Sequence, residues 1–366
     1  MSVQLSFDYR RESESCAGTP SGVANPFFRI LAAVRDMGSI GRAAEALGLS
    51  YRHVWGVIQQ WEETFGQPLL EALPGQAARL SDFGERLYWA ERRSQARAAP
   101  QAEALAAALD HAVASARWPE RPRIRFSGGY EPWLDPLRQA LEVAGGPLVT
   151  IEYPGAVEGL ARLNAGQCDI VGLALAIDAD SPCGRGSRIQ QAIGRHLRLG
   201  EHKLIRVGER MQGLLLPRSM PVGLVGLADL LRPGVRFACR PQGTANRMLM
   251  EDLWQAEGGA ANDMPAEVVE EPTQAAVAMA VAAGAADGGF GTEMHALACG
   301  LGFVPLVREQ IFVACRKPFL DTPQVAALRD TLATPHFQGI LEGLPGHRGP
   351  GAGGVISLRR TLPWYK

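Results

Sequence analysis

Over residues 27–34, apolar side chains recur every three or four positions, which is the spacing of one helix face, and Gly38 ends the run. Two more helices are predicted beyond it. Ser39 and Ser50 precede them and can cap them, because a serine hydroxyl accepts hydrogen bonds from free backbone N–H groups. Gly48 lies between these helices and permits a tight turn, since glycine adopts a positive φ at little cost. Such a pair of helices is typical of a helix-turn-helix.

The second of these helices has one apolar and one polar face. The polar face carries arginine, histidine and glutamine, which can reach base edges and phosphates. A helical hairpin with a solvated polar face has the same spacing, so that alternative stays open. The apolar face is predicted to consist of Val54, Trp55, Ile58, Trp61 and Phe65. The predicted DNA-binding residues are Ser50, Tyr51, Arg52, His53, Gln59, Gln60 and, from the segment after the helix, Arg79.

A short break and a long helix follow. Pro68 ends the second of these helices, and residues 72–80 can form a two-stranded wing. Ser81 caps the next helix, which is rich in alanine, leucine, arginine and glutamate through residue 115. Pro100 lies inside it, so we expect a kink or two helices. Its side chains are expected to face a partner helix, and packing on its own chain is the alternative. The expected contacts are Leu87, Trp89 and Ala90.

After a linker at 117–122, short apolar strands alternate with helical stretches, which is typical of layered α/β domains. The two longest strands, near 204–216 and 303–315, are expected to cross between two lobes. The predicted strands are Arg123–Phe126, Leu148–Tyr153, Asp169–Ala174, Leu204–Leu216, Val235–Cys239, Ala266–Val269, Ala286–Phe290 and Phe303–Cys315.

Three strand-to-helix junctions in this half carry small hydroxyl residues: Ser127, Thr244 and Thr273. A helix start offers free N–H groups and the positive end of the helix dipole, so it can bind an anion. Hydroxyl residues also cap helices without any ligand. Because the junctions recur within one α/β domain, we expect a ligand cleft. The predicted effector-binding residues are Ser127, Gly128, Tyr130, Arg240, Gly243, Thr244, Asn246, Arg247, Thr273, Gln274 and Gly289.

Composition narrows the classes of function. The net charge is −1 over 366 residues, so a nucleic-acid-binding surface must be local. The six cysteines include no C-x-x-C pair and no His cluster accompanies them, so neither a zinc site nor a disulfide framework is expected. No metal and no cofactor other than the effector ligand is predicted. We find no signal peptide and no membrane helix, and we expect a cytoplasmic protein with no membrane partner. No catalytic motif such as G-x-S-x-G or H-E-x-x-H occurs, so an enzyme is not expected.

The segment GSI-x-x-AA-x-x-LGLSY-x-x-VW, followed by L-x-E and LSDFGERL, identifies a resemblance. Residues 27–95 are similar to the winged helix-turn-helix shared by LysR-type regulators and the bacterial molybdate-responsive repressor. The resemblance implies that the helix from Tyr51 is the recognition helix and that Arg79 belongs to the wing. In LysR-type regulators the following helix pairs two subunits, which would place two recognition helices about 34 Å apart.

Residues 123–345 resemble the periplasmic-binding-protein-like domain found in cytoplasmic regulators and beside molybdopterin-biosynthesis modules. The resemblance implies two lobes, two hinge strands and a ligand between them. Relatives often have Gly-Ser-Gly-Thr-Arg where this chain has GTANR at 243–247, and Thr-His in place of Thr273 and Gln274, so a relative's ligand does not transfer. The small molybdate-binding β-domains of the molybdate-responsive repressor have no counterpart here. The matching segments are LNAGQCDIVGLAL, QGLLLP, RPQGTANRMLMEDL, TQAAVAMAVAAGAADGGFG and FVPLVREQIFV.

These observations predict an α/β protein with an all-α-rich N-terminal domain. The predicted parts are a disordered tail at 1–24, a winged helix-turn-helix at 25–80, a linker and dimerisation helix at 81–116, a two-lobed type-II periplasmic-binding-protein-like domain at 117–345 and a C-terminal tail at 346–366. That tail is expected either to pack on the sensor or to be loose.

The predicted function is that of a DNA-binding transcriptional regulator controlled by a small ligand. Its expected partners are double-stranded DNA, further copies of itself in a homodimer or homotetramer, and a small-anion effector. Molybdate, tungstate and a carboxylate such as formate are the candidate effectors, because the resembled families are associated with molybdenum metabolism. The alternative is a cytoplasmic small-ligand carrier that uses its N-terminal domain only for dimerisation.

Overall fold

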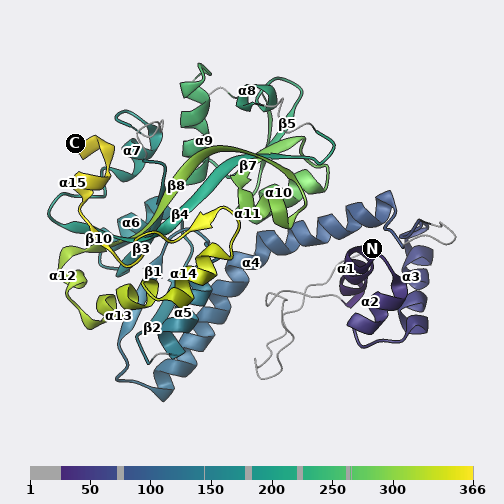
Figure 1. The fold of residues 1–366 in the computed structure, drawn as a ribbon, viewed down its shortest axis with the longest axis horizontal. Helices are drawn as coiled ribbons and strands as arrows, with labels where there is room; N and C mark the ends of the chain where they lie inside the picture. The colour runs from purple at the N-terminus through teal and green to yellow at the C-terminus, as the bar shows by residue number, and fades with distance from the viewer. Residues whose placement is uncertain are drawn as a thin grey trace. The chain divides into compact units, whose positions relative to one another are not determined.

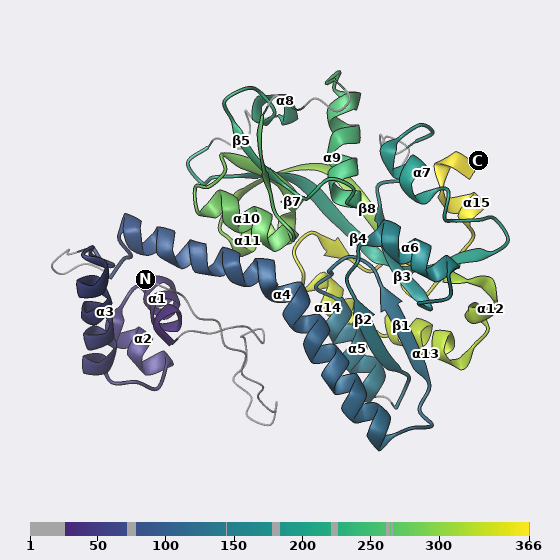
Figure 2. The same ribbon diagram turned by 180° about the vertical axis from the view of Figure 1, so that it is seen from behind.

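The computed structural model describes residues 26–71, 78–143, 145–177, 184–220, 226–260, 264 and 266–365. The chain divides into two compact units, Met1–Ala102 (unit 1) and Glu103–Lys366 (unit 2), and the boundary falls inside one helix, α4 (Asp82–Arg117). Figures 1 and 2 show the ribbon from opposite sides. The tail expected at 1–24 lies outside the described residues.

The predicted helix-turn-helix is confirmed in unit 1. The Ser39 and Ser50 hydroxyls accept hydrogen bonds from the backbone N–H groups of Arg42 and His53, at 3.4 and 3.1 Å, so each serine caps the helix after it. Gly48 forms the turn with φ of 65°, in the left-handed region that favours glycine. The helices are α1 (Pro26–Met37), α2 (Ile40–Ala46) and α3 (Tyr51–Phe65).

Packing between α1 and α3 forms the core of unit 1. Val54 and Ile58 are fully buried, and the Trp61 ring stacks on Phe27 with centroids 4.7 Å apart. Trp55 was expected on the same inner face, but it is 39% exposed. Successive residues of a helix are rotated by about 100°, so the side chain next to Val54 points away from the core.

The base of the predicted wing is present. Leu70 and Leu80 form an antiparallel bridge, and the Glu71 N–H donates to the Arg79 carbonyl at 3.0 Å. Residues 72–77, which would form the rest of the wing, lie outside the described residues.

The long helix α4 is continuous through Pro100, so the alternative of two separate helices is wrong. Ser81 precedes α4, and its hydroxyl accepts a hydrogen bond from the Gly84 N–H at 3.1 Å, as predicted. Trp89 is buried within unit 1, where the guanidinium carbon of Arg35 lies 4.9 Å from its ring centroid. The Trp89 side chain is therefore covered within its own unit, contrary to the expectation that it faces a partner helix.

Unit 2 is built on one mixed sheet with the strand order β2-β1-β3-β8-β4-β7-β5-β6. The eight predicted strands are all confirmed, with bounds within two residues of those predicted. They are β1 (Arg123–Ser127), β2 (Leu148–Glu152), β3 (Ile170–Leu175), β4 (His202–Leu216), β5 (Arg236–Cys239), β6 (Glu267–Glu270), β7 (Gly288–Thr292) and β8 (Gly302–Arg316).

The two longest strands, β4 and β8, connect two lobes, as predicted (Figure 1). They pair antiparallel along their length, while β3 pairs with one end of β8 and β7 with the opposite end of β4. We call the part with β1 to β3 lobe 1 and the part with β5 to β7 lobe 2. Pairing is parallel among β1 to β3 and among β5 to β7, so strand ends and the loops after them gather at one edge of each lobe.

Helices pack on both lobes. Those of lobe 1 are α5 (Leu134–Val143), α6 (Ala156–Asn164), α7 (Arg188–Ile193), α12 (Lys317–Leu320), α13 (Pro323–Leu332) and α14 (Pro335–Glu342). Those of lobe 2 are α8 (Leu227–Leu230), α9 (Ala245–Ala256), α10 (Gln274–Ala282) and α11 (Glu293–Ala298).

The C-terminal segment packs on unit 2, which decides between the two alternatives for 346–366. Its strands β9 (His347–Arg348) and β10 (Val355–Ile356) both pair with β4. After α15 (Leu358–Thr361), the Trp364 ring is buried, and the Tyr365 hydroxyl donates to the Gly194 carbonyl at 3.2 Å.

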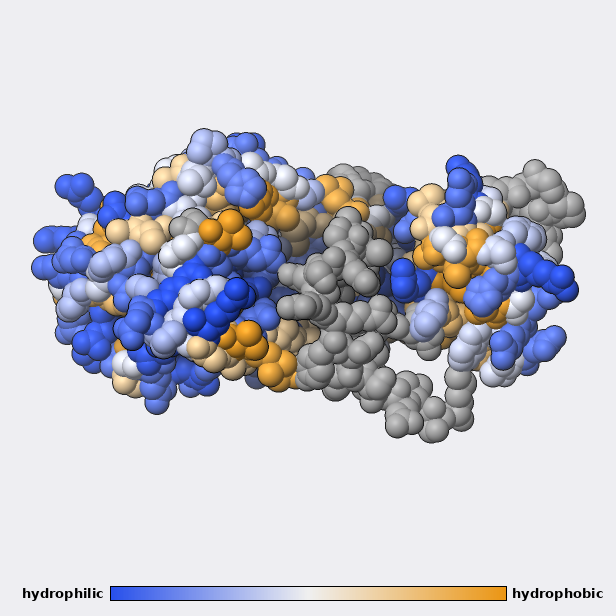
Figure 3. Space-filling view, turned by 90° about the horizontal axis from the view of Figure 1, so that it is seen from below, coloured by the Kyte–Doolittle hydropathy of each residue, from blue (hydrophilic) through white to orange (hydrophobic). Residues whose placement is uncertain are grey.

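No helix in the described part of the chain is long and apolar enough to cross a membrane. On the face drawn in Figure 3, apolar residues occur in separate groups among hydrophilic ones.

Candidate DNA-binding surface and effector site

The predicted DNA-binding residues are all exposed. Ser50 caps α3, five of the others lie within α3, and Arg79 lies at the base of the wing. Within the described part of the chain, the side chains of Arg52, His53, Gln59 and Gln60 have no hydrogen-bond or ion-pair partner. They are therefore available to base edges and phosphates.

Trp55 joins this exposed surface, although its apolar character suggested a core position. Exposed apolar side chains on a recognition helix can contact the methyl group of thymine. Tyr51, one turn before it, is 56% exposed. The sequence could have placed Trp55 outside the core, because it lies next to the buried Val54 and is rotated by about 100° from it around the helix axis. Apolar character alone does not show this.

The hydroxyl groups predicted to converge on an anion have partners within unit 2. The Thr244 hydroxyl accepts a hydrogen bond from the N–H three residues later at 3.3 Å and caps α9. The Thr273 hydroxyl caps α10 in the same way, at 3.0 Å. Ser127 forms a hydrogen bond with the Cys168 thiol; burial raises the pKa of that thiol, and the hydrogen bond opposes the rise. Helix capping, the alternative interpretation, therefore accounts for both threonines.

A buried ion group lies on the hinge strands. Arg210 of β4 faces Glu309 of β8 in register, and its Nε donates to the Glu309 carboxylate at 2.7 Å. The Arg210 Nη1 donates to Glu131, in the loop after β1, at 2.6 Å. Gln212 donates to Glu309 at 2.8 Å. We call these four residues the hinge ion group. The group contains one guanidinium and two carboxyl groups, and Glu131 ties lobe 1 to the hinge.

The hinge ion group is not predicted from the sequence, although the sequence contains one signal of it. Arg210 and Glu309 interrupt two long apolar strands, and charged side chains are rarely buried unless they are paired. Their pairing depends on the register of strands that are 99 residues apart in the chain. The contribution of Glu131 from a loop has no sequence pattern at all.

Arg240 lies directly after β5 and approaches the hinge ion group from lobe 2 without joining it. Its guanidinium Nε is buried and has no hydrogen-bond partner. Burial lowers the pKa of Arg240 to about 10; the nearby Glu131 carboxylate raises this pKa and Arg210 lowers it. The predicted effector-binding arginine is thus a half-buried cation that forms no ion pair within the described residues.

Two predicted amide residues also have buried atoms without partners. Both amide atoms of Asn246, in the first turn of α9, lack a hydrogen bond, and this side chain is 7% exposed. Two further buried oxygens lack a hydrogen bond. They are the Oε1 of Gln274, the first residue of α10, and the Oε1 of Gln212 in the hinge. Buried polar atoms are nearly always paired, so unused hydrogen-bonding capacity remains at the predicted helix starts and at the hinge.

The predicted glycines serve backbone packing and turning. A Cβ at Gly128 would lie 3.1 Å from the Gly172 nitrogen, so the glycine lets the loop after β1 approach β3. A Cβ at Gly289 would lie 2.9 Å from the Ala238 carbonyl oxygen, so the close approach here is to β5 rather than to a ligand. Gly243 is exposed with φ of 82°, which favours glycine before α9.

Tyr130 and Arg247 are held by other side chains. The Tyr130 hydroxyl donates to Glu103 of α4 at 2.6 Å, and burial is the main reason that its pKa is raised. Arg247 pairs with Glu251 at 2.7 Å and donates to the Cys239 thiol at 2.7 Å. Neither predicted residue is free in this arrangement.

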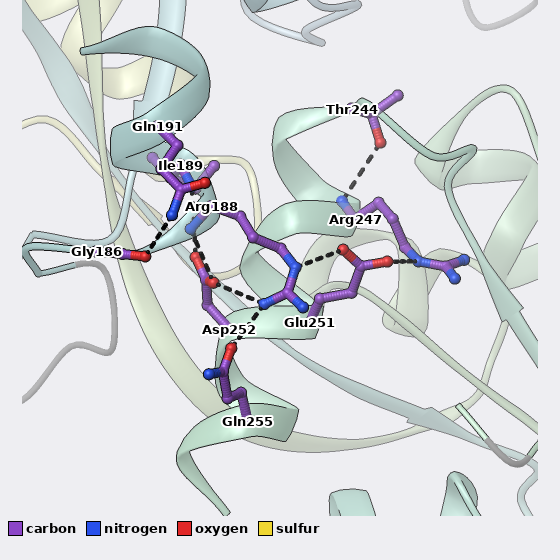
Figure 4. A network of polar contacts seen from close by, with 9 residues as sticks. All are labelled: Gly186, Arg188, Ile189, Gln191, Thr244, Arg247, Glu251, Asp252 and Gln255. Carbon is purple, nitrogen blue, oxygen red and sulfur yellow. Dashed lines mark hydrogen bonds and ion pairs between the residues drawn. The ribbon is translucent and has the colours of Figure 1, made fainter. Parts of the chain in front are cut away.

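A cavity of about 520 Å³ lies between α7 of lobe 1 and α9 of lobe 2. Figure 4 shows the polar network beside it: Arg188 of α7 reaches Glu251 at 3.2 Å and Asp252 at 3.4 Å, and Arg247 reaches Glu251 from the other side. The lobes are therefore joined by ion pairs at this position. The lining includes Arg188, Gln191, Arg195, Gly243, Arg247 and Trp254.

Two histidines lie within the electrostatic reach of Arg210. Burial, together with the positive charge of Arg210, lowers the pKa of His295 to about 3 and that of His347 to about 4. The His295 Nδ1 and the Thr292 hydroxyl are 2.6 Å apart. Both histidines are neutral at neutral pH and serve as structural groups. Among the described residues, no group of three or more His, Cys, Asp or Glu side chains is placed to hold a metal ion.

Comparisons with known families identify both parts of the chain. Residues 140–333, more than half of the chain, match the PBP superfamily domain, and residues 27–85 match the bacterial regulatory helix-turn-helix of the lysR family. The chain belongs to the PBP superfamily and carries a lysR-family helix-turn-helix at its N-terminal side. It is a LysR-type transcriptional regulator with an effector-binding domain, and not an enzyme.

Individual relatives cover the chain to different extents. The uncharacterized protein YvgK of Bacillus subtilis is 28% identical over 240 residues, which are 64% of this chain and 74% of YvgK. The molybdenum-pterin-binding protein MopA of Rhodobacter capsulatus is 37% identical over 75 residues, which are 19% of this chain and 28% of MopA. The structure of full-length LTTR LysG from Corynebacterium glutamicum with bound effector Arg is 17% identical, covers 84% of this chain and 97% of LysG, and has a TM-score of 0.41.

Proposed function

We propose that this regulator responds to a small anion bound between the lobes against Arg240, with the amides of Asn246 and Gln274 supplying further hydrogen bonds. Arg240 is the observation that carries the proposal. The Arg240 Nε is buried without a hydrogen-bond partner among the described residues, and a bound anion would supply one. The hinge carboxylates form their ion pairs with Arg210, and Glu131 offsets only part of the cost of burying Arg240, whose pKa stays lowered.

Molybdate, tungstate and formate are the proposed effectors. The molybdenum oxyanions are supported by the resemblance of the N-terminal sequence to the molybdate-responsive repressor and by the name of MopA, whose similarity spans 19% of this chain. A tetrahedral oxyanion offers several acceptor oxygens to Arg240 and the Asn246 amide, whereas formate offers two. Arg240, Asn246 and Gln274 all belong to lobe 2, so the proposed signal requires that lobe 1 contacts the anion when the lobes close. Such an anion shifts the population toward the closed arrangement.

We also propose that the protein acts in the cytoplasm as a homodimer or homotetramer and that α4 contributes the subunit contact. Leu105, Leu109 and Val113 repeat every four residues on α4, so they share one face of the helix. They are exposed by 43%, 44% and 69%. Ala90 is exposed as well, and Leu87 is half-buried. A second copy of the helix is the natural cover for this apolar face.

Sedimentation equilibrium of the full chain and of Leu109→Glu tests this proposal; an unchanged mass for the variant would contradict it.

Thermal unfolding of the full chain in the presence of molybdate, tungstate, sulfate, phosphate or formate tests the effector proposal. A specific anion at a hundredfold excess over its dissociation constant adds about 2.7 kcal/mol to the free energy of unfolding. Arg240→Gln should abolish this stabilisation, because it removes the charge while keeping a polar side chain.

Arg195→Gln is the matched control. Arg195 is an exposed arginine that lines the α7–α9 cavity, so its loss should leave the stabilisation intact. If Arg195→Gln and not Arg240→Gln abolishes the effect, the anion binds in that cavity and the proposed site is wrong. If no anion stabilises the protein, the effector is not one of these anions, and the DNA-binding function stands unchanged.

A further inference from the structure

Gly56 lies in the middle of α3, and no contact with the described residues requires a glycine there. It is exposed, and a Cβ at this position would have no heavy atom within 4 Å. Other glycines of unit 1 have local reasons. Gly48 and Gly66 have left-handed φ angles of 65° and 64°, and a Cβ at Gly84 would lie 2.4 Å from the Leu69 carbonyl oxygen.

A glycine inside a helix reduces stability relative to alanine, because its backbone loses more conformational freedom on folding. Gly41 also has space for a side chain, since its Cβ would meet only the Ser39 hydroxyl at 3.8 Å. Gly41, however, is the second residue of α2, where the helix is only beginning. Gly56 is the sixth of the fifteen residues of α3, so here the glycine lowers the stability of a helix interior.

Helical periodicity places Gly56 at the centre of the predicted DNA-binding face. Arg52 lies one turn before it, and Gln59 and Gln60 lie one turn after it, all exposed and without side-chain partners in the described part of the chain. The buried residues of α3 point to the opposite side. The face therefore has a notch at Gly56, with long polar side chains on both sides of it along the helix.

We propose that Gly56 is the point where α3 approaches DNA most closely, and that its missing side chain sets how deeply the helix enters the major groove. The groove is about 12 Å wide, and a helix with its side chains is about 10–12 Å across, so the fit is tight. A methyl group at the centre of the contacting face holds the helix away from the bases. Arg52, Gln59 and Gln60 then lose base contacts, while phosphate contacts through flexible side chains adjust.

The test compares the wild-type full chain with Gly56→Ala on two DNA probes. One probe is a duplex that the wild-type protein selects from a random-sequence library, and the other is the unselected random duplex. Gly56→Ala should bind the selected duplex roughly tenfold more weakly or worse, since base contacts are lost. Its affinity for the random duplex should change by less than about twofold, because non-specific binding depends on phosphates.

The same substitution should raise the melting temperature of unit 1 by roughly 4–8 °C, because alanine favours the helix. A variant that is more stable yet binds its site more weakly cannot owe the loss to misfolding. Gly339→Ala is the matched control: Gly339 lies in α14, its Cβ would also have no heavy atom within 4 Å, and its substitution should leave both affinities unchanged.

Three results would overturn the proposal. The first is that Gly56→Ala binds the selected duplex as tightly as the wild type does. The second is that it loses affinity equally for both probes, and the third is that it is less stable than the wild type. The first would mean that the notch is unused, the second that only the backbone is sensed, and the third that the glycine has a structural role. If the wild-type protein selects no sequence, sequence-specific DNA binding fails and this proposal fails with it.

Discussion

The two units present their functional groups in opposite ways. In unit 1 the side chains of Arg52, His53, Gln59 and Gln60 are exposed and have no partner among the described residues. In unit 2 the polar atoms without a partner at the candidate effector site, on Arg240, Asn246 and Gln274, are buried. A DNA duplex is a large, preformed surface and is read by side chains that project from a rigid helix. A small ligand is surrounded, so its binding groups are withdrawn from water. Substitutions should therefore separate binding from stability in unit 1 and couple them in unit 2.

The largest expected effect on stability comes from the hinge ion group. Arg210→Met removes its cation and leaves the carboxylates of Glu131 and Glu309 buried without their partner. The free energy of unfolding of unit 2 should fall by about 3–5 kcal/mol, because an uncompensated buried charge is costly. Urea denaturation at neutral pH measures it. A loss below about 1 kcal/mol would show that water reaches the carboxylates and that the group is not buried as described.

Arg52→Ala should have the complementary effect in unit 1. Affinity for a selected duplex should fall by about 10- to 100-fold, since a base or phosphate contact is lost, while the free energy of unfolding changes by less than about 0.5 kcal/mol. Arg29→Ala, on the exposed side of α1, removes the same charge away from α3. Equal losses of affinity for the two variants, measured by fluorescence anisotropy, would mean that net charge rather than the α3 contact determines binding.

The contrast between the units also explains what the sequence predicts. The helices, caps and turn of unit 1 follow from contiguous residues such as Ser39, Gly48 and Ser50, and the strands of unit 2 follow from local apolar runs. At Thr244 an anion contact was predicted, whereas the hydroxyl caps α9. The sequence does not separate the two roles, because a hydroxyl at a helix start caps the helix with or without a ligand.

The hinge ion group needs information that no local pattern contains. Arg210 and Glu309 meet through the register of two distant strands, and Glu131 joins them from a loop in lobe 1. The position of Trp55 around the helix axis follows from the sequence, but the residue was predicted to be buried because it is apolar, and it is exposed. Local chemistry thus predicts elements and exposed surfaces well, whereas a buried polar site depends on tertiary pairing.

The buried histidines predict a pH dependence for unit 2. The unfolded chain binds a proton at His347 near pH 6.5, whereas the folded protein holds the pKa of His347 at about 4. Between these values the unfolded state binds more protons, so the stability present above pH 6.5 is lost as the pH falls. From about pH 7 to about pH 5, His347 should reduce the free energy of unfolding by about 1–2 kcal/mol, and His295 acts in the same direction.

Denaturation of His347→Gln at the two pH values isolates this contribution, because the variant should have a smaller pH-dependent loss of stability than the wild type. His336→Gln, at an exposed position of α14, controls for the removal of a histidine. An unchanged pH dependence in His347→Gln would mean that His347 is hydrated in the folded state. The exposed DNA-binding face should contribute little to the slope, which sharpens the difference between the units.

The smallest expected effect decides between capping and ligand binding at Thr244. If its hydroxyl serves only as the N-cap of α9, Thr244→Ala should lower the free energy of unfolding by about 1 kcal/mol, and Thr244→Ser should restore it. Stabilisation by the effector anion should survive in both variants, whereas Arg240→Gln abolishes it. If Thr244→Ala instead loses anion binding at little cost in stability, the hydroxyl belongs to the ligand. In that case the site extends along the start of α9. Thr244 would then both cap this helix and bind the ligand.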